Sequence, residues 1–327
     1  MLAALLLAAA GPSTTPPPPA DPVTAVVHAE DADRFAALFA RSGGTPTAEQ
    51  LQHEYLDRGT YGVHVFTEWR IRDAAHLART VAAKRERYAA AIRDCLPVAR
   101  ATTGELRATY LALRGLYPDR ALPQIYLVFG AGNSGGTAGP GAQVLGLEKM
   151  CEMAPTPDAL RALMRFFFAH ETVHALQRDP APEVGPLLAS VMREGAADFV
   201  AALATGRPSD PERAAWAGSR EAELWRRLGA DLEATRGLSP DRVEPGTPAA
   251  DAMRRWVNNH GSAPSGWPGE LGYWMGQRVW ERWFDRQPDK RAALDRMLAL
   301  DRLDEVLAAG APAAAPNVTG VSARTPP

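Results

Sequence analysis

The chain has 327 residues, of which 46% are hydrophobic and 23% charged, and its formal net charge is −2. These proportions are ordinary for a globular protein, and the length suits one large domain or two closely fused lobes. Arginines and acidic residues are interspersed. This excludes the concentrated basic surface that binding to nucleic acid or to an anionic membrane requires, so we expect no nucleic-acid partner.

The two ends differ from the rest of the chain. Met1–Ala10 is apolar, ends in small residues and is followed by the proline run Pro16–Pro19. This pattern resembles a secretory signal, and it is too short to span a bilayer, which takes about twenty apolar residues. Residues 1–25 are therefore predicted to be a signal peptide and Pro-rich spacer, which implies export to the periplasm or the extracellular space. Because no Lys or Arg precedes the apolar run, an Ala-rich disordered end stays open as the alternative.

The region between the ends is predicted to be a single domain over residues 26–310, without a transmembrane segment. Apolar side chains recur at helical spacing over Asp73–Cys95 and Thr103–Leu116. From residue 311 to residue 327 the chain is rich in Ala, Pro, Thr and Ser and has no apolar period, which predicts a disordered tail. Cys95 and Cys151 are the two cysteines, and either a disulfide or two buried thiols fits their number.

The pattern changes after residue 123. Gln124–Gly130 and Ala142–Glu148 are predicted to be strands, separated by the Gly-rich loop Ala131–Gly141. They form either a hairpin or neighbouring strands of a small sheet. The loop lacks the Gly-Lys-Ser/Thr of a phosphate-binding loop, so a plain connection is favoured over nucleotide binding. The second strand is either an interior strand or a free edge to which an extended peptide could add.

Helices dominate the rest of the chain, which makes the predicted fold class α+β and predominantly helical, with a small β-sheet or hairpin. Thr156-Pro157-Asp158 is typical of a helix start, and Gly206 is typical of a helix end. The predicted helices are Thr156–Arg178, Gly185–Thr205, Arg220–Arg236, Glu270–Arg286 and one or two within Pro288–Leu307.

The first of these helices contains the sequence His-Glu-Thr-Val-His, residues 170 to 174. Residues four apart lie on one helix face, so His170 and His174 can direct both imidazoles at one point. Two such nitrogens are half of the ligand set of a tetrahedral zinc ion. Glu171 lies beside them and could take a proton from a zinc-activated water during attack on a carbonyl.

The following helix offers a third ligand. Its sequence Glu-Gly-Ala-Ala-Asp, residues 194 to 198, places two acids four residues apart on a strongly apolar segment. Carboxylates in such surroundings are expected to be paired or metal-bound. An antiparallel helix pair would return Glu194 to the histidines as a ligand. Asp198, one turn further, could accept the remaining N–H of His170 and fix its tautomer.

HETVH followed twenty residues later by EGAAD resembles the gluzincin metallopeptidases, of which thermolysin is the best-known member. The resemblance implies a zincin-like domain with an active-site helix pair, in which His170, His174 and Glu194 bind zinc. It also implies that Glu171 is the general base and that Asp198 supports a ligand. The Asn-x-aromatic motif of thermolysin-like enzymes is not found here, so substrate and oxyanion roles are not carried over.

A narrower resemblance is to a family of uncharacterised bacterial predicted zinc-dependent proteases. Only its zinc motif is specific. The resemblance rests on Ile125–Phe129 with Leu145–Glu148, on His170–Gln177 with Glu194–Phe199, and on Gly272–Gly276.

We therefore expect an exported metallopeptidase that uses one catalytic Zn²⁺ to hydrolyse bonds in a peptide or protein substrate. Two alternatives stay open: a non-catalytic binding or envelope protein on a zincin scaffold, and a zinc hydrolase of a non-peptide amide. The intact Glu171 argues against the first of these. The motif does not separate the second from a peptidase.

Three further residues are weaker candidates. The phenol of Tyr273 could stabilise a developing oxyanion, but a core aromatic fits equally well. His260 is a rival donor from a loop, although a surface imidazole is the simpler interpretation. Arg278 could bind a substrate carboxylate, or it could form a solvated ion pair with Glu281.

Overall fold

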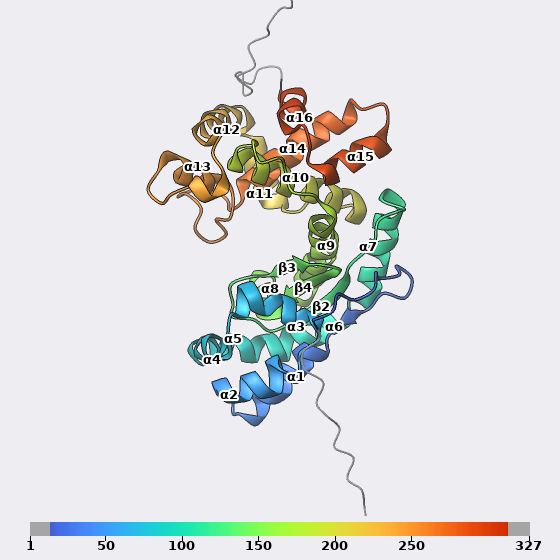
Figure 1. Ribbon diagram of the computed structural model, residues 1–327, viewed down its shortest axis with the longest axis vertical. Coiled ribbons are helices and arrows are strands. Elements are labelled where there is room, and N and C mark those ends of the chain that lie inside the picture. The colour runs from blue at the N-terminus through green and yellow to red at the C-terminus, as the bar shows by residue number, and fades with distance from the viewer. Residues whose placement is uncertain (1–13, 313–327) are drawn as a thin grey trace, which may run out of the picture. The chain divides into compact units, whose positions relative to one another are not determined.

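The computed structural model describes residues 14–312 (Figure 1). The chain divides into two compact units, the first ending at Ala175 and the second beginning at Leu176. Two compact units can belong to one domain, so the single domain expected over residues 26–310 stays a prediction. Residues 1–13 of the expected signal peptide and spacer, and residues 313–327 of the expected tail, lie outside the described residues.

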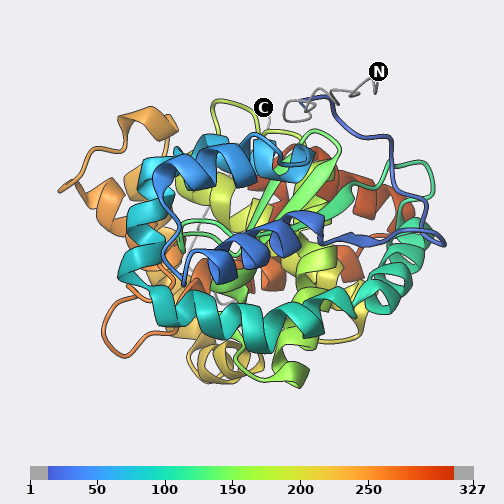
Figure 2. The same ribbon diagram turned by 90° about the horizontal axis from the view of Figure 1, so that it is seen from below.

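The first unit is built on a four-stranded sheet. Its strands are β1 (Val27–His28), β2 (Gln124–Val128), β3 (Gly136–Gly139) and β4 (Ala142–Gly146), in the spatial order β1-β2-β4-β3. β2 is parallel to β1 and to β4, whereas β3 is antiparallel to β4. Figure 2 shows the sheet among the helices of the first hundred residues.

The two predicted strands are confirmed, as neighbours in one sheet and not as the arms of one hairpin. All five residues of β4 are buried between β2 and β3, so its interpretation as an interior strand is correct. The edge is formed by β3, which lies within the segment expected to be a loop. Its sequence Gly-Thr-Ala-Gly carries too few side chains to indicate a strand.

Helices account for the rest of the first unit, and the predominantly helical α+β class is confirmed. The segment expected to be helical over Asp73–Cys95 comprises two α-helices, Ala74–Ala83 and Arg85–Ala90, and a π-helical turn, Ala91–Cys95. The helices are α1 (Glu30–Arg41), α2 (Ala48–Leu51), α3 (Tyr61–Phe66), α4 (Ala74–Ala83), α5 (Arg85–Ala90), α6 (Leu96–Arg100), α7 (Thr103–Leu116), α8 (Leu147–Met153) and α9 (Pro157–Leu176), with π-helical turns η1 (Gln52–Leu56), η2 (Thr67–Ile71) and η3 (Ala91–Cys95).

A disulfide settles the question that the two cysteines left open. Cys95, at the end of η3, is bonded to Cys151 in α8, with α-carbons 5.9 Å apart. Because the bridge closes a loop with a sequence separation of 56 residues, it is expected to stabilise the first unit by roughly 4 kcal/mol. It ties the helix after β4 to the helices of the N-terminal half.

In the second unit, the regular elements of the described residues are helices joined by loops. Its α10 ends where Gly206 adopts a left-handed conformation, with φ at 69°. The helices are α10 (Pro186–Thr205), α11 (Pro211–Gly218), α12 (Glu221–Thr235), α13 (Pro248–Trp256), α14 (Leu271–Asp285), α15 (Lys290–Ala299) and α16 (Leu303–Gly310), with a 3-10 turn η4 (Pro240–Arg242). No helix of residues 14–312 is long and apolar enough to cross a membrane.

Two glycines let α10 and α14 approach backbone to backbone. A β-carbon on Gly276 would lie 1.9 Å from the carbonyl oxygen of Val191, and one on Gly195 would lie 2.2 Å from the carbonyl carbon of Gly276. Any side chain at either position would therefore force the helices apart. This contact fixes the helix that carries Glu194.

Candidate metal centre

The HETVH sequence lies in the last turns of α9, as its spacing predicts. His170 is buried, whereas Glu171 and His174 are partly exposed. Thr172 and Val173 are also buried, so one side of the motif faces the protein interior and the other side is partly exposed. The motif is therefore anchored by its buried residues, and solvent can reach Glu171 and His174.

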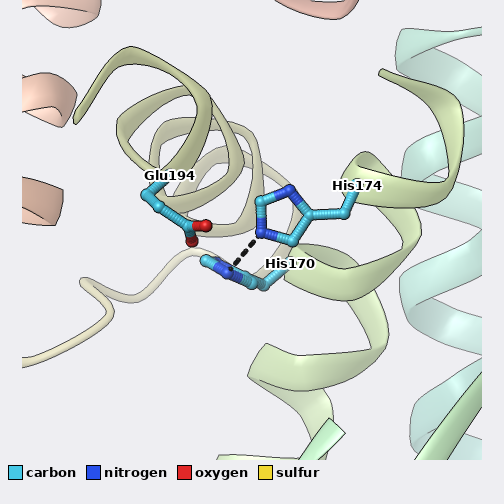
Figure 3. Close-up of side chains that lie close together, drawn as sticks. All are labelled: His170, His174 and Glu194. Carbon is cyan, nitrogen blue, oxygen red and sulfur yellow. Dashed lines mark hydrogen bonds between the residues drawn. The ribbon is translucent and has the colours of Figure 1, made fainter. Parts of the chain in front are cut away.

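His170, His174 and Glu194 bring their ligand atoms together (Figure 3). One atom from each residue lies within 4.8 Å of the other two. The Nε2 atoms of the two histidines are 3.0 Å apart. These three residues therefore form a group that could hold a metal ion, as the spacing of the two motifs predicted.

The donor set fits zinc, and so does the spacing of the two imidazole nitrogens. Bonds of roughly 2.0–2.1 Å in a tetrahedral site place neighbouring ligand atoms roughly 3.3 Å apart. The two imidazole nitrogens already have about this separation, and Glu194 supplies the carboxylate of a His₂Glu set. A zinc ion held by these three residues would keep one tetrahedral position for water or substrate, as catalytic zinc sites do and structural ones do not.

The carboxylate of Glu171 lies against the edge strand. A β-carbon built on Gly136 would be 3.0 Å from Oε1 of Glu171, so only a glycine leaves this space open without displacement. Glu171 follows His170 directly along the helix. The candidate base therefore stands between a metal ligand and the backbone of β3.

The loop that leads into β3 is held by a buried carboxylate. Glu148 accepts hydrogen bonds from the backbone N–H groups of Gly130 and Gly132, at 3.0 and 2.9 Å. Burial raises the pKa of the Glu148 carboxyl group. These bonds fix the first residues of the Gly-rich segment and hence the start of the edge strand.

Hydrogen bonds from β4 support the helix beneath the motif. Gln143, fully buried in β4, donates from Nε2 to the carbonyl oxygen of Phe167 at 2.7 Å, and its Oε1 lies 3.4 Å from the hydroxyl of Thr172. Burial raises the pKa of the nearby Tyr110, which stays protonated and donates to the carbonyl of Pro123. The sheet thus sets the position of α9 through neutral polar groups.

Asp198 is buried on α10 and is held by two partners. It accepts hydrogen bonds from the Ser209 hydroxyl at 2.8 Å and from the Arg213 guanidinium at 3.1 Å. Both members of the ion pair are buried, at 1% and 7% exposure. A hydrogen bond from His170 to Asp198 stays a prediction, whereas the ion pair of Arg213 with Asp198 is present in the structure.

Arg213 also connects Asp198 to the beginning of α14. Its Nη1 donates to the carbonyl oxygen of Glu270 at 3.1 Å, and its guanidinium carbon lies 5.8 Å from the ring centre of Tyr273. Tyr273 is partly exposed in the first turn of α14. The oxyanion role of Tyr273 stays a prediction, but the residue belongs to the same network as Asp198.

The remaining candidates lie apart from this network. His260 is exposed, as a surface imidazole would be, and its neighbour Asn259 is the buried residue that accepts from the N–H of Glu270. Arg278 forms an ion pair with Glu281, so the simpler interpretation of this arginine is confirmed. A catalytic role for His260 stays a prediction.

Sequence reasoning missed Gln143 and Arg213. A glutamine inside an otherwise apolar strand could have signalled the first, because a buried amide needs partners. Arg213 lies in a polar segment without an apolar period, and nothing in its surroundings in the sequence indicates burial.

No protein-family model, no curated protein and no solved structure matches this chain.

Proposed function

We propose that the protein is a zinc-dependent peptidase of the gluzincin type, with His170, His174 and Glu194 as the metal ligands. The observation that carries the proposal is the convergence of these three side chains, with ligand atoms within 4.8 Å of one another, beside the carboxylate of Glu171. Two nitrogens and one carboxylate leave an open position for chemistry, as hydrolytic zinc sites do.

When bound, zinc would supply a Lewis acid and lower the pKa of a coordinated water toward neutral. Glu171 then serves as general base: its carboxylate takes a proton from the attacking water as this water adds to the peptide carbonyl. Its place beside His170 and against Gly136 brings that carboxylate between ligand and edge strand. Asp198 and Arg213 hold α10, and with it Glu194, in place.

An extended peptide is the substrate that the surroundings of Glu171 favour. Gly135 accepts from the N–H of Gly146 in β4, so in this antiparallel ladder the alternate residues Gly136 and Ala138 direct their backbone groups away from β4. Ala138 is exposed. A peptide that added to this edge would pass directly beside Glu171, which supports hydrolysis of a peptide bond.

The disulfide supports the proposal that the protein works outside the cytoplasm. Bridges such as Cys95–Cys151 persist in oxidising compartments and are rare where thiols are kept reduced. This agrees with the signal peptide and Pro-rich spacer expected over residues 1–25. Export to the periplasm or the extracellular space is therefore part of the proposed function.

The test is the substitution E171Q, which keeps the size of the side chain and removes the base. We expect zinc content to be unchanged and hydrolysis of a mixed peptide library to fall at least about 100-fold. E86Q, an exposed substitution on α5, is the matched control and should keep full activity. Unchanged hydrolysis in E171Q would contradict the proposal. Zinc binding without hydrolysis of any peptide by the native protein would favour a binding protein or a hydrolase of other amides.

A further inference from the structure

The π-helical turn η2 contacts the edge strand β3, which also carries Gly136 next to the candidate base. Nε of Arg70 donates to the hydroxyl of Thr137 in β3 at 2.8 Å. The carbonyl oxygen of Arg70 accepts from Nδ2 of Asn133, in the loop before β3, at 3.0 Å. Arg72, which ends the turn, has a φ of 69°. π-helical turns and such backbone strain are frequent at functional sites, and here both occur beside β3.

Arg70 and Glu171 contact opposite faces of the same strand. Successive residues of a strand point to opposite faces, and a β-carbon on Gly136 would meet Glu171 whereas the side chain of Thr137 meets Arg70. A peptide paired with β3 alternates in the same way. When one of its residues faces Glu171, the residue next to it faces η2 and Arg70.

The guanidinium of Arg70 is available to a substrate. It is half-buried, and among residues 14–312 no carboxylate forms an ion pair with it. Some other arginines of the first unit are paired with acids, for example Arg34 with Asp31, Arg41 with Glu54, Arg93 with Asp94 and Arg161 with Glu105. Trp69, the neighbour of Arg70, is 69% exposed. The bond to Thr137 orients the guanidinium and leaves its two terminal amino groups for another acceptor.

We propose that Arg70 is a specificity-determining residue that selects an acidic side chain next to the bond that is cleaved. The proposal rests on the proposed function, because it assigns the substrate class of the same site. A guanidinium recognises a carboxylate through two parallel charge-assisted hydrogen bonds, and its partial burial strengthens them.

The experiment compares fluorogenic peptides that differ only by Glu or Gln at the positions flanking the cleaved bond. We expect the native protein to cleave the Glu peptide with a kcat/KM at least about 10-fold higher at one flanking position. R70Q should remove this preference, so that the Glu and Gln peptides are cleaved with equal kcat/KM, while R70E should favour a Lys peptide. R79Q, an exposed substitution on α4, is the control for net charge and should keep the preference. No preference in the native protein, or a preference that persists in R70Q, would overturn the proposal.

A binding measurement separates this proposal from the proposed function. The same Glu and Gln peptides, labelled with fluorescein, are titrated with the zinc-loaded E171Q variant and followed by fluorescence anisotropy. Tighter binding of the Glu peptide that disappears in the double variant E171Q/R70Q supports Arg70, even if no peptide is hydrolysed by the native protein. Equal binding of the two peptides overturns the role of Arg70, even if the native protein is an active peptidase.

Discussion

Helices α9 and α10 both carry candidate metal ligands, but the protein holds them by different contacts. α9 rests on the sheet, where the neutral amide of Gln143 binds the Phe167 carbonyl and approaches Thr172. α10 is held by a backbone contact through Gly276 and by the buried ion pair of Asp198 with Arg213. Removing one partner of a neutral hydrogen bond costs less than stranding a buried charge. We therefore expect α10 to be the more sensitive of the two helices.

The largest effect is expected for R213M. This substitution leaves the Asp198 carboxylate buried without its cation, and breaking such a pair costs about 3–5 kcal/mol. Urea unfolding should show the loss, and zinc affinity should fall as well, because Glu194 lies one turn before Asp198 on the same helix. R242M, an exposed substitution in the second unit, should change neither quantity. A loss below about 1 kcal/mol would mean that the pair does not hold α10.

The second largest effect is expected for G276A. Its methyl group would lie 1.9 Å from the Val191 carbonyl oxygen, a contact that only movement of α10 or α14 can relieve. We expect the free energy of unfolding to fall by about 3 kcal/mol. G218A is the control, because a β-carbon at that helical glycine meets nothing within 4 Å, and it should leave the stability unchanged or raise it slightly. Equal stability of the two variants would contradict the close contact of α10 with α14.

A smaller effect is expected for Q143L, which tests the support of α9. The substitution keeps a similar volume and removes the donor to Phe167, so the free energy of unfolding should fall by about 1–3 kcal/mol. Activity should fall with it, since the same contact holds the helix of Glu171. Urea unfolding and peptide hydrolysis measure the two effects. If Q143L proved as damaging as R213M, the contrast between the two helices would be wrong.

The difference between the helices also explains what could be predicted from sequence. The spacing within α9 and α10 is local, so the ligands His170, His174 and Glu194 could be predicted to converge. The residues that support each helix lie outside it, Gln143 24 residues before Phe167 and Arg213 15 residues after Asp198, and no motif links them to the helices. The edge strand β3 could not be predicted, because glycines at both ends remove the alternation of side chains that indicates a strand.

Zinc binding by the purified protein and by its ligand variants tests the central claim most directly. Elemental analysis and calorimetric titration of the native protein should give one equivalent of Zn²⁺. The variants H174A and E194A should each lose most of this affinity while keeping the far-ultraviolet circular dichroism of the native fold. The absence of stoichiometric zinc in the native protein, or equal zinc affinity in the native protein and both variants, would contradict the assignment of this site.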